Sequence, residues 1–183
     1  MRTGCRLRQT KTGVWSFTKV FATVKKTILR EIILQELRLE LGRQTSAAQL
    51  ARDEAISEES RAQNKWDTHS QEAAYLAEGQ AKIAAEIGSS IELYSTLALP
   101  EFAASDVIAV GALVELETGA GSNAWYFVGP RAGGLEIEFE GHSVLVLTPH
   151  SPLGRQLIGK RAGDSVTSTG RGAAATQRIL SVQ

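Results

Sequence analysis

The sequence predicts an α+β protein, in which an N-terminal antiparallel α-helical hairpin (a coiled coil) precedes a small, mainly antiparallel β domain with one short helix. Three observations lead to this prediction. Apolar residues recur at helical spacing through most of the first hundred residues, Leu99-Pro100 ends that pattern, and after residue 106 apolar and polar residues alternate. With 183 residues, the chain has room for one domain or two small ones.

The composition is that of an ordinary globular protein. Hydrophobic residues make up 43% and charged residues 22%, and 20 basic side chains balance 20 acidic ones. This balance argues against a basic nucleic-acid-coating protein. No apolar run approaches the ~18 residues that a membrane span needs, so we expect no membrane partner. The single cysteine, Cys5, excludes an internal disulfide and a cysteine-based zinc site, and it fits a cytoplasmic location.

Charge is unevenly distributed along the chain. Residues 1–45 hold ten basic and three acidic side chains, residues 46–99 four and nine, and residues 100–183 six and eight. The first 23 residues contain five basic residues, no acid and no clear periodicity. We expect residues 1–23 to form a disordered basic extension, with an organelle transit peptide as the alternative, and we assign them no function.

Residues 24–99 are expected to form the hairpin. A first helix is predicted from about Val24 to Glu59, because no proline interrupts it and apolar residues recur at mostly helical spacing. The apolar residues of this first helix are Ile28, Ile32, Leu37, Leu41, Ala48, Ala51 and Ala55.

A second helix is predicted from about Thr68 to Leu97, where Thr68 and Gln71 form a capping-box pattern. Within it, a heptad seam is expected, with Ile83 and Ile87 buried between the helices. That seam comprises Leu76, Gln80, Ile83, Ile87, Ser90, Tyr94 and Leu97. Two long helices joined by a short polar turn bury their apolar stripes against each other, so a projecting finger is expected, with two arms of a larger helical bundle as the alternative.

Residues 106–183 are expected to form the β domain. Alternation predicts strands over 110–117, 125–128, 135–140, 144–147, 165–169 and 177–182. Between the fourth and fifth strands, Ser151-Pro152 has the pattern of an N-cap with proline at the first helical position, and Gly159 stands where a C-terminal glycine belongs. Leu153, Leu157 and Ile158 of this short helix are expected to face the sheet.

The segment from Ser151 to Val166, SPLGRQLIGKRAGDSV, resembles the S-P-x-x-R-A-L-x-G-K-x-x-G-D-x-V signature of the GreA/GreB transcript-cleavage factors. Val110-Gly111 and Val128-Gly129-Pro130 are similar to the same C-terminal domain in order and spacing. The match covers about residues 106–183, and a preceding helical hairpin is also the architecture of that family.

The resemblance implies an FKBP-like C-terminal domain that docks at the rim of the secondary channel of bacterial core RNA polymerase. It implies that the finger enters this channel, so that contact with the transcript is indirect. The residues that match the docking signature are Ser151, Pro152, Arg155, Leu157, Gly159, Lys160, Gly163 and Asp164. A monomer is expected, because this binding mode needs a free finger.

In the cleaving members of the family, acidic residues at the finger tip help to hold a second, weakly bound Mg²⁺ of the polymerase active centre. Such a metal stabilises the attacking and leaving oxygens of phosphodiester hydrolysis. The resemblance therefore implies no catalytic activity and no cofactor of the chain's own, apart from a share in that Mg²⁺.

The tip of this sequence departs from the family loop, which reads approximately G-D-L-S-E-N-A-E-Y. When Asn64 is set on the family's asparagine, Gln63 replaces the glutamate and Ser60 the aspartate, and neutral groups bind Mg²⁺ poorly. Cleavage stimulation is therefore doubtful. The nearby acids that can substitute are Glu58, Glu59 and Asp67, which are otherwise ordinary loop or helix-end residues.

Trp66 is expected to pack onto the tip, with a contact to the polymerase as the alternative.

Two other functions remain open at this point. The FKBP-like fold suggests a prolyl isomerase, but fold does not carry function. Isomerase pockets need convergent aromatic side chains, whereas Trp125, Tyr126 and Phe127 are adjacent on one strand and point alternately to opposite faces. A coiled-coil adaptor for another partner is the third possibility.

Overall fold

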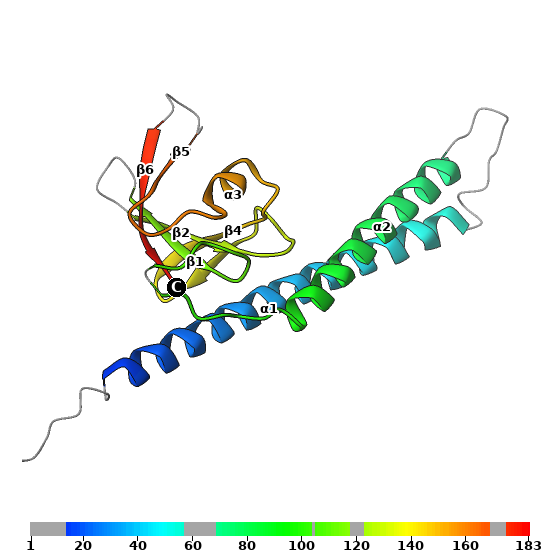
Figure 1. Cartoon of the computed structure of the whole chain (residues 1–183). Coiled ribbons are helices and arrows are strands. Elements are labelled where there is room, and N and C mark those ends of the chain that lie inside the picture. Colours follow the sequence, from blue (N-terminus) through cyan, green and yellow to red (C-terminus); the bar gives the residue numbers. More distant parts are fainter. Residues whose placement is uncertain (1–13, 57–68, 104, 118–122, 169–174) are drawn as a thin grey trace, which may run out of the picture.

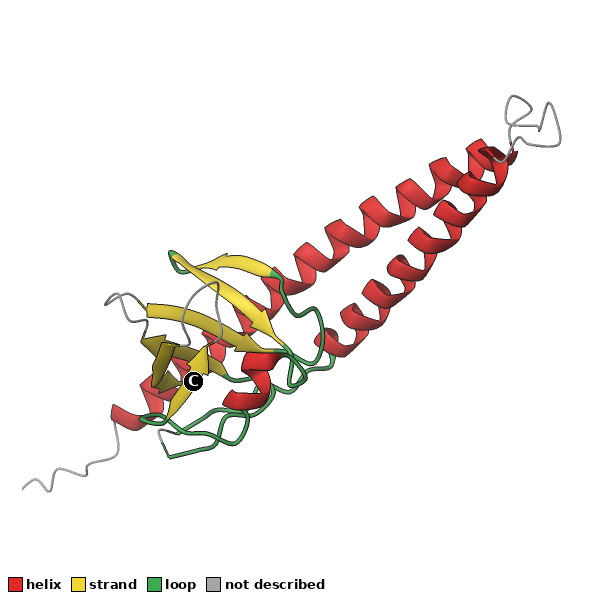
Figure 2. Ribbon diagram, turned by 90° about the horizontal axis from the view of Figure 1, so that it is seen from above, coloured by secondary structure: helices red, strands yellow, loops and turns green. Residues whose placement is uncertain are grey.

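The computed structural model describes residues 14–56, 69–103, 105–117, 123–168 and 175–183. Two long helices, α1 (Val14–Ile56) and α2 (His69–Ser95), form an antiparallel hairpin, and a six-stranded sheet lies against α1 near the base of that hairpin (Figure 1). Seen from above, the hairpin projects well beyond the sheet (Figure 2). This is the predicted α+β architecture, and the fold class is confirmed.

Helix α1 is longer than the sequence analysis predicted. It has 43 residues, or about 65 Å of helix, and begins at Val14, ten residues before the predicted start. Residues 14–23 are therefore helical, which corrects the extension expected for residues 1–23 over that part. Residues 1–13 lie outside the described residues. The reason for the difference is that no proline or glycine separates residues 14–23 from the periodic segment, so the helix continues through them.

The hairpin seam differs in part from the predicted one. On both helices, buried or half-buried residues alternate at spacings of three and four. In α1 they are Leu37, Leu41, Gln44, Ala48 and Ala51, and in α2 they are Ala73, Ala77, Gln80, Ala84, Ile87, Ile91 and Tyr94. The prediction that Ile83 and Leu76 lie in the seam is wrong, since their exposed fractions are 46% and 55%. Alanines occupy the central line, where two closely approaching helices leave little room for longer side chains, and Ile83 and Leu76 lie on its flank.

Two further predictions for the hairpin have mixed outcomes. Ile28 is half-exposed, because the face of α1 that packs on the sheet at this level is formed by Leu29 and Ile33. Ile87 is half-buried and packs against the core cluster at the hairpin base. Thr68 of the predicted capping box lies outside the described residues.

The sheet contains six strands in the order β3-β4-β2-β1-β6-β5. Neighbouring strands are antiparallel except for β2 and β4, which are parallel and pair Trp125 with Val144 and Phe127 with Val146. The strands are β1 (Leu113–Glu117), β2 (Asn123–Val128), β3 (Glu136–Phe139), β4 (His142–Leu147), β5 (Ser165–Ser168) and β6 (Ala175–Val182), and the short helix is α3 (Pro152–Leu157).

The six strands predicted from alternation are all present, with small differences at their ends. The first strand begins at Leu113 and not at Val110, because the backbone of Gly111 has a φ of +91° and leaves the extended conformation. The Gly111 N–H donates to the carbonyl oxygen of Val128 at 2.8 Å, which closes this end of the domain.

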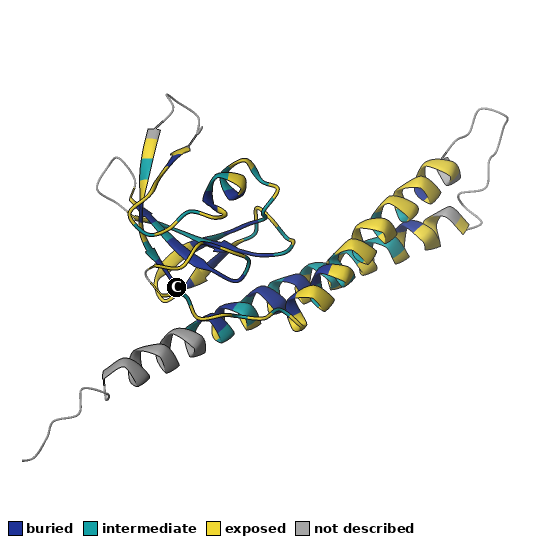
Figure 3. Cartoon of the chain, viewed as in Figure 1, coloured by how far each residue is buried: buried dark blue, intermediate teal, exposed yellow. Residues whose placement is uncertain are grey.

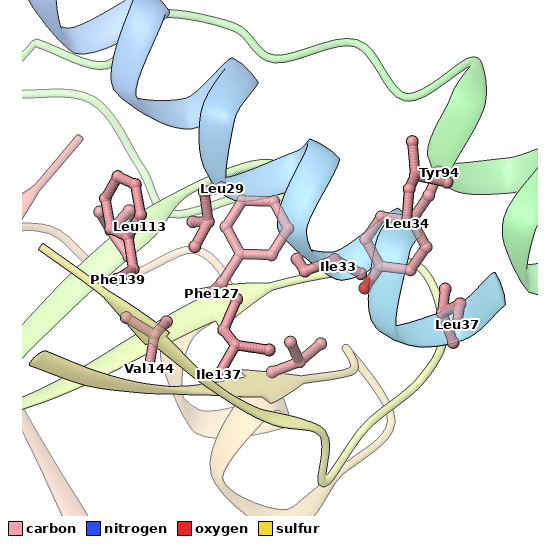
Figure 4. Packing of buried hydrophobic residues seen from close by; sticks show 11 residues of the cluster. Leu29, Ile33, Leu34, Leu37, Tyr94, Leu113, Phe127, Ile137, Phe139 and Val144 are labelled. Atoms are coloured by element: carbon pink, nitrogen blue, oxygen red, sulfur yellow. The ribbon is translucent and has the colours of Figure 1, made fainter. Parts of the chain in front are cut away.

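Two hydrophobic clusters lie on the two faces of the sheet. One face packs against α1 and the end of α2, where α1 contributes Leu29, Ile33, Leu34 and Leu37 and the sheet contributes Phe127 and Val144 among others (Figure 4). The other face packs against α3 and the chain around Ile108, with Leu157 and Ile179 fully buried. The buried residues thus lie on both faces of the sheet and at the hairpin base, and the far part of the hairpin is mostly exposed (Figure 3).

Tyr94 joins the end of α2 to the sheet. Its side chain is fully buried, and its hydroxyl donates to the carbonyl oxygen of Arg131 at 2.8 Å. Burial raises the pKa of the Tyr94 hydroxyl, so this group remains a donor. A Cβ atom at Gly129 would lie 1.9 Å from the Tyr94 hydroxyl oxygen, so the glycine makes room for the tyrosine.

Lys26 holds the segment that links α2 to the domain. Its side chain is 1% exposed, its Nζ donates to the carbonyl oxygen of Pro100, and Nζ lies 4.9 Å from the centre of the Phe102 ring. Burial lowers the pKa of Lys26 to about 8, an effect that Glu101 partly opposes. A single side chain of α1 therefore binds the linker through a carbonyl group and an aromatic ring.

We predict that Gly129→Ala destabilises the protein by about 1–3 kcal/mol, because the added methyl group overlaps the Tyr94 hydroxyl. Tyr94→Phe alone should cost about 1 kcal/mol through the lost hydrogen bond. The double variant Gly129→Ala/Tyr94→Phe should lose less stability than the sum of the losses in the two single variants, because the phenylalanine removes the oxygen that the new methyl group overlaps. Urea unfolding of the four proteins measures this coupling, and strictly additive losses would contradict the contact.

A second prediction concerns pH. The pKa of Lys26 is about 8 in the folded protein, below the ~10.4 of an unfolded lysine, so between these values the unfolded chain binds more protons. The contribution of Lys26 to stability is therefore least favourable below pH 8 and improves as the pH rises toward 10. Compared with Lys26→Met, the wild type should gain stability between pH 7 and pH 9.5 in urea unfolding. An equal difference between the two proteins at both pH values would contradict this assignment.

Candidate functional site

The tip of the hairpin is the first candidate region. Its residues lie between Ile56, the last residue of α1, and His69, the first of α2. The tip residues singled out in the sequence therefore all lie outside the described residues, and their roles stay predictions. They are Glu58, Glu59, Ser60, Gln63, Asn64, Trp66 and Asp67.

The second candidate region is α3, whose N-terminus is built as the sequence predicts. The hydroxyl of Ser151 accepts a hydrogen bond from the Gly154 N–H at 3.0 Å and donates to the carbonyl oxygen of Thr148 at 2.8 Å. Pro152 occupies the first turn, where its missing N–H costs nothing. A Cβ at Gly154 would lie 1.9 Å from the Thr148 carbonyl oxygen, so only glycine fits where the first turn of α3 meets this strand end.

The C-terminal end of α3 is also as predicted, with one exception. Gly159 follows the helix with a φ of +82°, and its N–H donates to the carbonyl oxygen of Ile108 at 2.9 Å. Leu157 is fully buried against the sheet and Leu153 is half-buried. The prediction that Ile158 faces the sheet is wrong, because the helix ends there and the side chain remains 38% exposed.

The remaining part of the signature forms the turn into β5. Gly163 has a φ of +94°, and one carboxylate oxygen of Asp164 accepts a hydrogen bond from the Arg161 N–H at 2.8 Å. The Gly163 N–H donates to the carbonyl of Ile179, and the Ile179 N–H donates to the carbonyl of Asp164, both at 2.8 Å. The glycine and the aspartate therefore shape the turn that joins α3 to β5, and this turn is hydrogen bonded to β6.

The signature thus divides into two groups of residues. Ser151, Leu157, Gly159, Gly163 and Asp164 build the local fold. Pro152 and Arg155 are exposed and Lys160 is half-buried, so these three are available at the surface.

Three surface residues next to this group do not belong to the signature residues predicted to dock. Arg161 is exposed, and Ile158 and Val107 are partly exposed apolar residues. Val107 lies at the end of α3 because the neighbouring Ile108 is hydrogen bonded to Gly159 and Lys160. Arg161 occupies a variable position of the signature, and Val107 is distant from it in sequence. The signature therefore identifies neither residue, and only the fold brings both next to Arg155 and Lys160. We call the whole set the α3 surface: Val107, Pro152, Arg155, Ile158, Lys160 and Arg161.

The α3 surface combines positive charge with exposed apolar side chains. Arg155, Lys160 and Arg161 form no ion pair with any other residue that the structure describes. Such an arrangement suits a protein partner that offers carboxylates around an apolar contact.

A half-open hollow of about 180 Å³ lies elsewhere, where α1 meets the sheet edge. In this hollow, Lys25 Nζ lies 2.7 Å from a Glu140 carboxylate oxygen, and the centre of the His142 ring lies 5.4 Å from that of the Trp125 ring. The lining residues are Lys25, Leu113, Trp125, Phe139, Glu140, His142, Val144 and Gln183.

Within residues 14–56, 69–103, 105–117, 123–168 and 175–183, no group of three or more His, Cys, Asp and Glu residues is placed to hold a metal ion. None of the helices described is both long and apolar enough to cross a membrane.

No protein-family model matches the chain, and no curated protein sequence matches it significantly. Among solved structures, it is similar to GreA factor homolog 1 (Gfh1) of Thermus thermophilus, at 21% identity and a TM-score of 0.36 over 84% of this chain and 94% of that one. It is similar to Thermus aquaticus Gfh1 at 24% identity and a TM-score of 0.35, over 83% and 92% of the two chains. A further structure of the transcription factor Gfh1 has 19% identity and a TM-score of 0.38, over 84% and 92%. At these values the likeness concerns the fold alone.

Proposed function

We propose that the protein is a non-enzymatic, Gre-like regulator of transcription elongation that binds bacterial RNA polymerase at its secondary channel. The observation that carries the proposal is the signature over residues 151–166, in a domain that follows a projecting helical hairpin. The signature residues act together, because Ser151, Gly159 and Asp164 shape a short helix and a turn that leave Arg155 and Lys160 at the surface.

In this proposal the α3 surface docks on the rim of the channel. Its three cations and its exposed Ile158 and Val107 provide electrostatic attraction and an apolar anchor. The partner surface must then be acidic with an apolar centre. We also propose that the protein is a monomer and acts in the cytoplasm, where the polymerase is found.

The hairpin is the part that reaches toward the active centre. Helix α2 has 27 residues, which correspond to about 40 Å, and residues 46–99 carry four basic and nine acidic side chains. A net negative finger suits a site where Mg²⁺ ions are bound. The protein itself contributes no metal, and any Mg²⁺ at the tip is shared with the polymerase active centre.

The effect on the polymerase follows from the tip sequence. Stimulated cleavage needs carboxylates to hold the second Mg²⁺, and Ser60 and Gln63 occupy the positions where the family has acids. We therefore propose that the protein occupies the channel and modulates the enzyme, with little stimulation of cleavage.

A prolyl isomerase activity is not supported by the aromatic side chains of β2. Phe127 is fully buried in the cluster beneath α1, and Trp125 packs against the same cluster. Tyr126 packs on the opposite face against the cluster beneath α3. These three rings therefore do not converge on one pocket.

Charge reversal tests the docking surface. The double variant Arg155→Glu/Lys160→Glu should weaken binding to core RNA polymerase by about tenfold or more, mainly through slower association at low salt. Both side chains are at the surface, so unfolding curves should remain close to those of the wild type. The matched control is Arg131→Glu, an exposed arginine outside the α3 surface, which should bind normally. If the double variant binds as tightly as the wild type, or if no binding to core enzyme is found, the proposed docking is wrong.

The tip is tested by RNA shortening in stalled, backtracked complexes at limiting Mg²⁺. The wild type should bind the complexes but shorten the transcript weakly or not at all, and Ser60→Asp/Gln63→Glu should increase shortening because it restores carboxylates. Glu58→Ala/Glu59→Ala and Asp67→Ala should change little. Strong shortening by the wild type that is lost in Glu58→Ala/Glu59→Ala would instead assign the metal-binding role to those two carboxylates.

A further inference from the structure

The side chains between the two helices change in size along the hairpin. Near the sheet, the seam contains Leu37, Ile87, Ile91 and Tyr94. Toward the tip it contains small residues, namely Ala47, Ala48, Ala51, Ala73 and Ala77. Burial of apolar surface stabilises helix packing roughly in proportion to area, so each turn near the tip is held less strongly than each turn near the sheet.

A polar level separates these two parts. Gln44 lies twelve residues before the last residue of α1, and Gln80 lies eleven residues after the first residue of α2, so the two lie at about the same height in this antiparallel hairpin. The Gln44 side-chain amide donates to a Glu40 carboxylate oxygen at 2.7 Å. The side-chain oxygen of Gln80 is buried and has no hydrogen-bond partner. A buried acceptor without a partner favours local opening, because water satisfies it once the helices separate.

Two helical glycines lie next to this polar level, Gly42 in α1 and Gly79 in α2. Nothing lies within 4 Å of the position that a Cβ atom would take at either residue, so packing does not require a glycine there. Glycine within a helix lowers its stability relative to alanine. Both helices are therefore weakened within one turn of the polar level.

The two parts of the hairpin also differ in how they are joined to the rest of the protein. At the base, Leu37 and Tyr94 belong to the cluster that contains Phe127 and Val146 of the sheet. None of the described residues beyond Gln44 and before Gln80 belongs to either hydrophobic cluster. The base therefore cannot open without disrupting the domain core, whereas the far part can.

We propose that the hairpin opens in two independent steps and that the level of Gln44 and Gln80 is the hinge. The distal arm, residues 44–56 and 69–80, separates and unfolds locally, while the base, residues 25–41 and 84–95, stays helical and packed on the sheet. This device makes the position of the tip adjustable, which is useful to a finger that must enter a narrow space in any partner. The inference concerns the chain alone and does not depend on the proposed function.

Hydrogen–deuterium exchange of the full chain, read by mass spectrometry, tests the proposal under conditions where exchange reports the opening equilibrium. Backbone amides of the distal arm should exchange about a hundredfold faster than those of the base. Gly79→Ala should slow exchange in the distal arm about fivefold, as expected for alanine in place of a helical glycine. Gln80→Leu should slow it about tenfold, because it removes the unpaired oxygen. Neither variant should change exchange in the base.

Gly88→Ala is the matched control. Gly88 lies in the base of α2, and its Cβ position is equally free of neighbours. If the distal arm opens alone, the base stays helical in both the closed and the open state of the arm. Gly88→Ala then stabilises both states equally and leaves exchange in the distal arm unchanged. Equal protection of the arm and the base, or equal slowing of the arm by Gly79→Ala and Gly88→Ala, would show that the hairpin opens as one unit and would overturn the proposal. Unchanged exchange in both Gly79→Ala and Gln80→Leu would overturn it as well.

Discussion

The packing of α1 across one face of the sheet is the contact on which the remaining structure depends. Leu29 and Ile33 are fully buried there against residues such as Phe127 and Val144, so a segment near the start of the chain covers strands that come a hundred residues later. This contact buries one of the two hydrophobic faces of the sheet, and α3 covers the other. It also anchors one helix of a hairpin that would otherwise be held only by the partner helix.

Two side chains determine how the hairpin leaves the domain. Tyr94 attaches the end of α2 to the loop after β2, and Lys26 attaches α1 to the linker at Pro100 and Phe102. Both bonds are made by polar groups on otherwise buried side chains, and each joins a helix to a backbone carbonyl. Because hydrogen bonds are directional, they define an orientation that apolar packing alone would leave less precise. The rigid part of the finger thus extends from the sheet to the level of Gln44 and Gln80.

The opposite face of the sheet carries the surface that we assign to partner binding. The signature residues there have two roles, and the structure separates them. Ser151, Gly154 and Asp164 hold a short helix and a turn in place through backbone contacts, whereas Arg155 and Arg161 project from the resulting frame. A six-residue helix needs such capping, since it has too few internal hydrogen bonds to be stable alone. The positions of the side chains on the α3 surface therefore depend on the capping contacts that hold α3 and the turn in place.

The sequence by itself determined the features that depend on neighbouring residues. Periodicity located the two helices and six strands, and the caps of α3 and the turn at Gly163 were predicted because serine, proline and glycine have strong local preferences. Arg155 and Lys160 were found through the signature. The tertiary structure decided which of several possible stripes became the seam. Leu76 and Ile83 satisfy heptad spacing as well as Ala77 and Ala84 do, but close approach of the helices favours the alanines. The tertiary structure also decided that Lys26 is buried and that Val107 lies beside Ile158 at the surface. These contacts link residues that are distant in the chain, so no periodic pattern in the sequence indicates them.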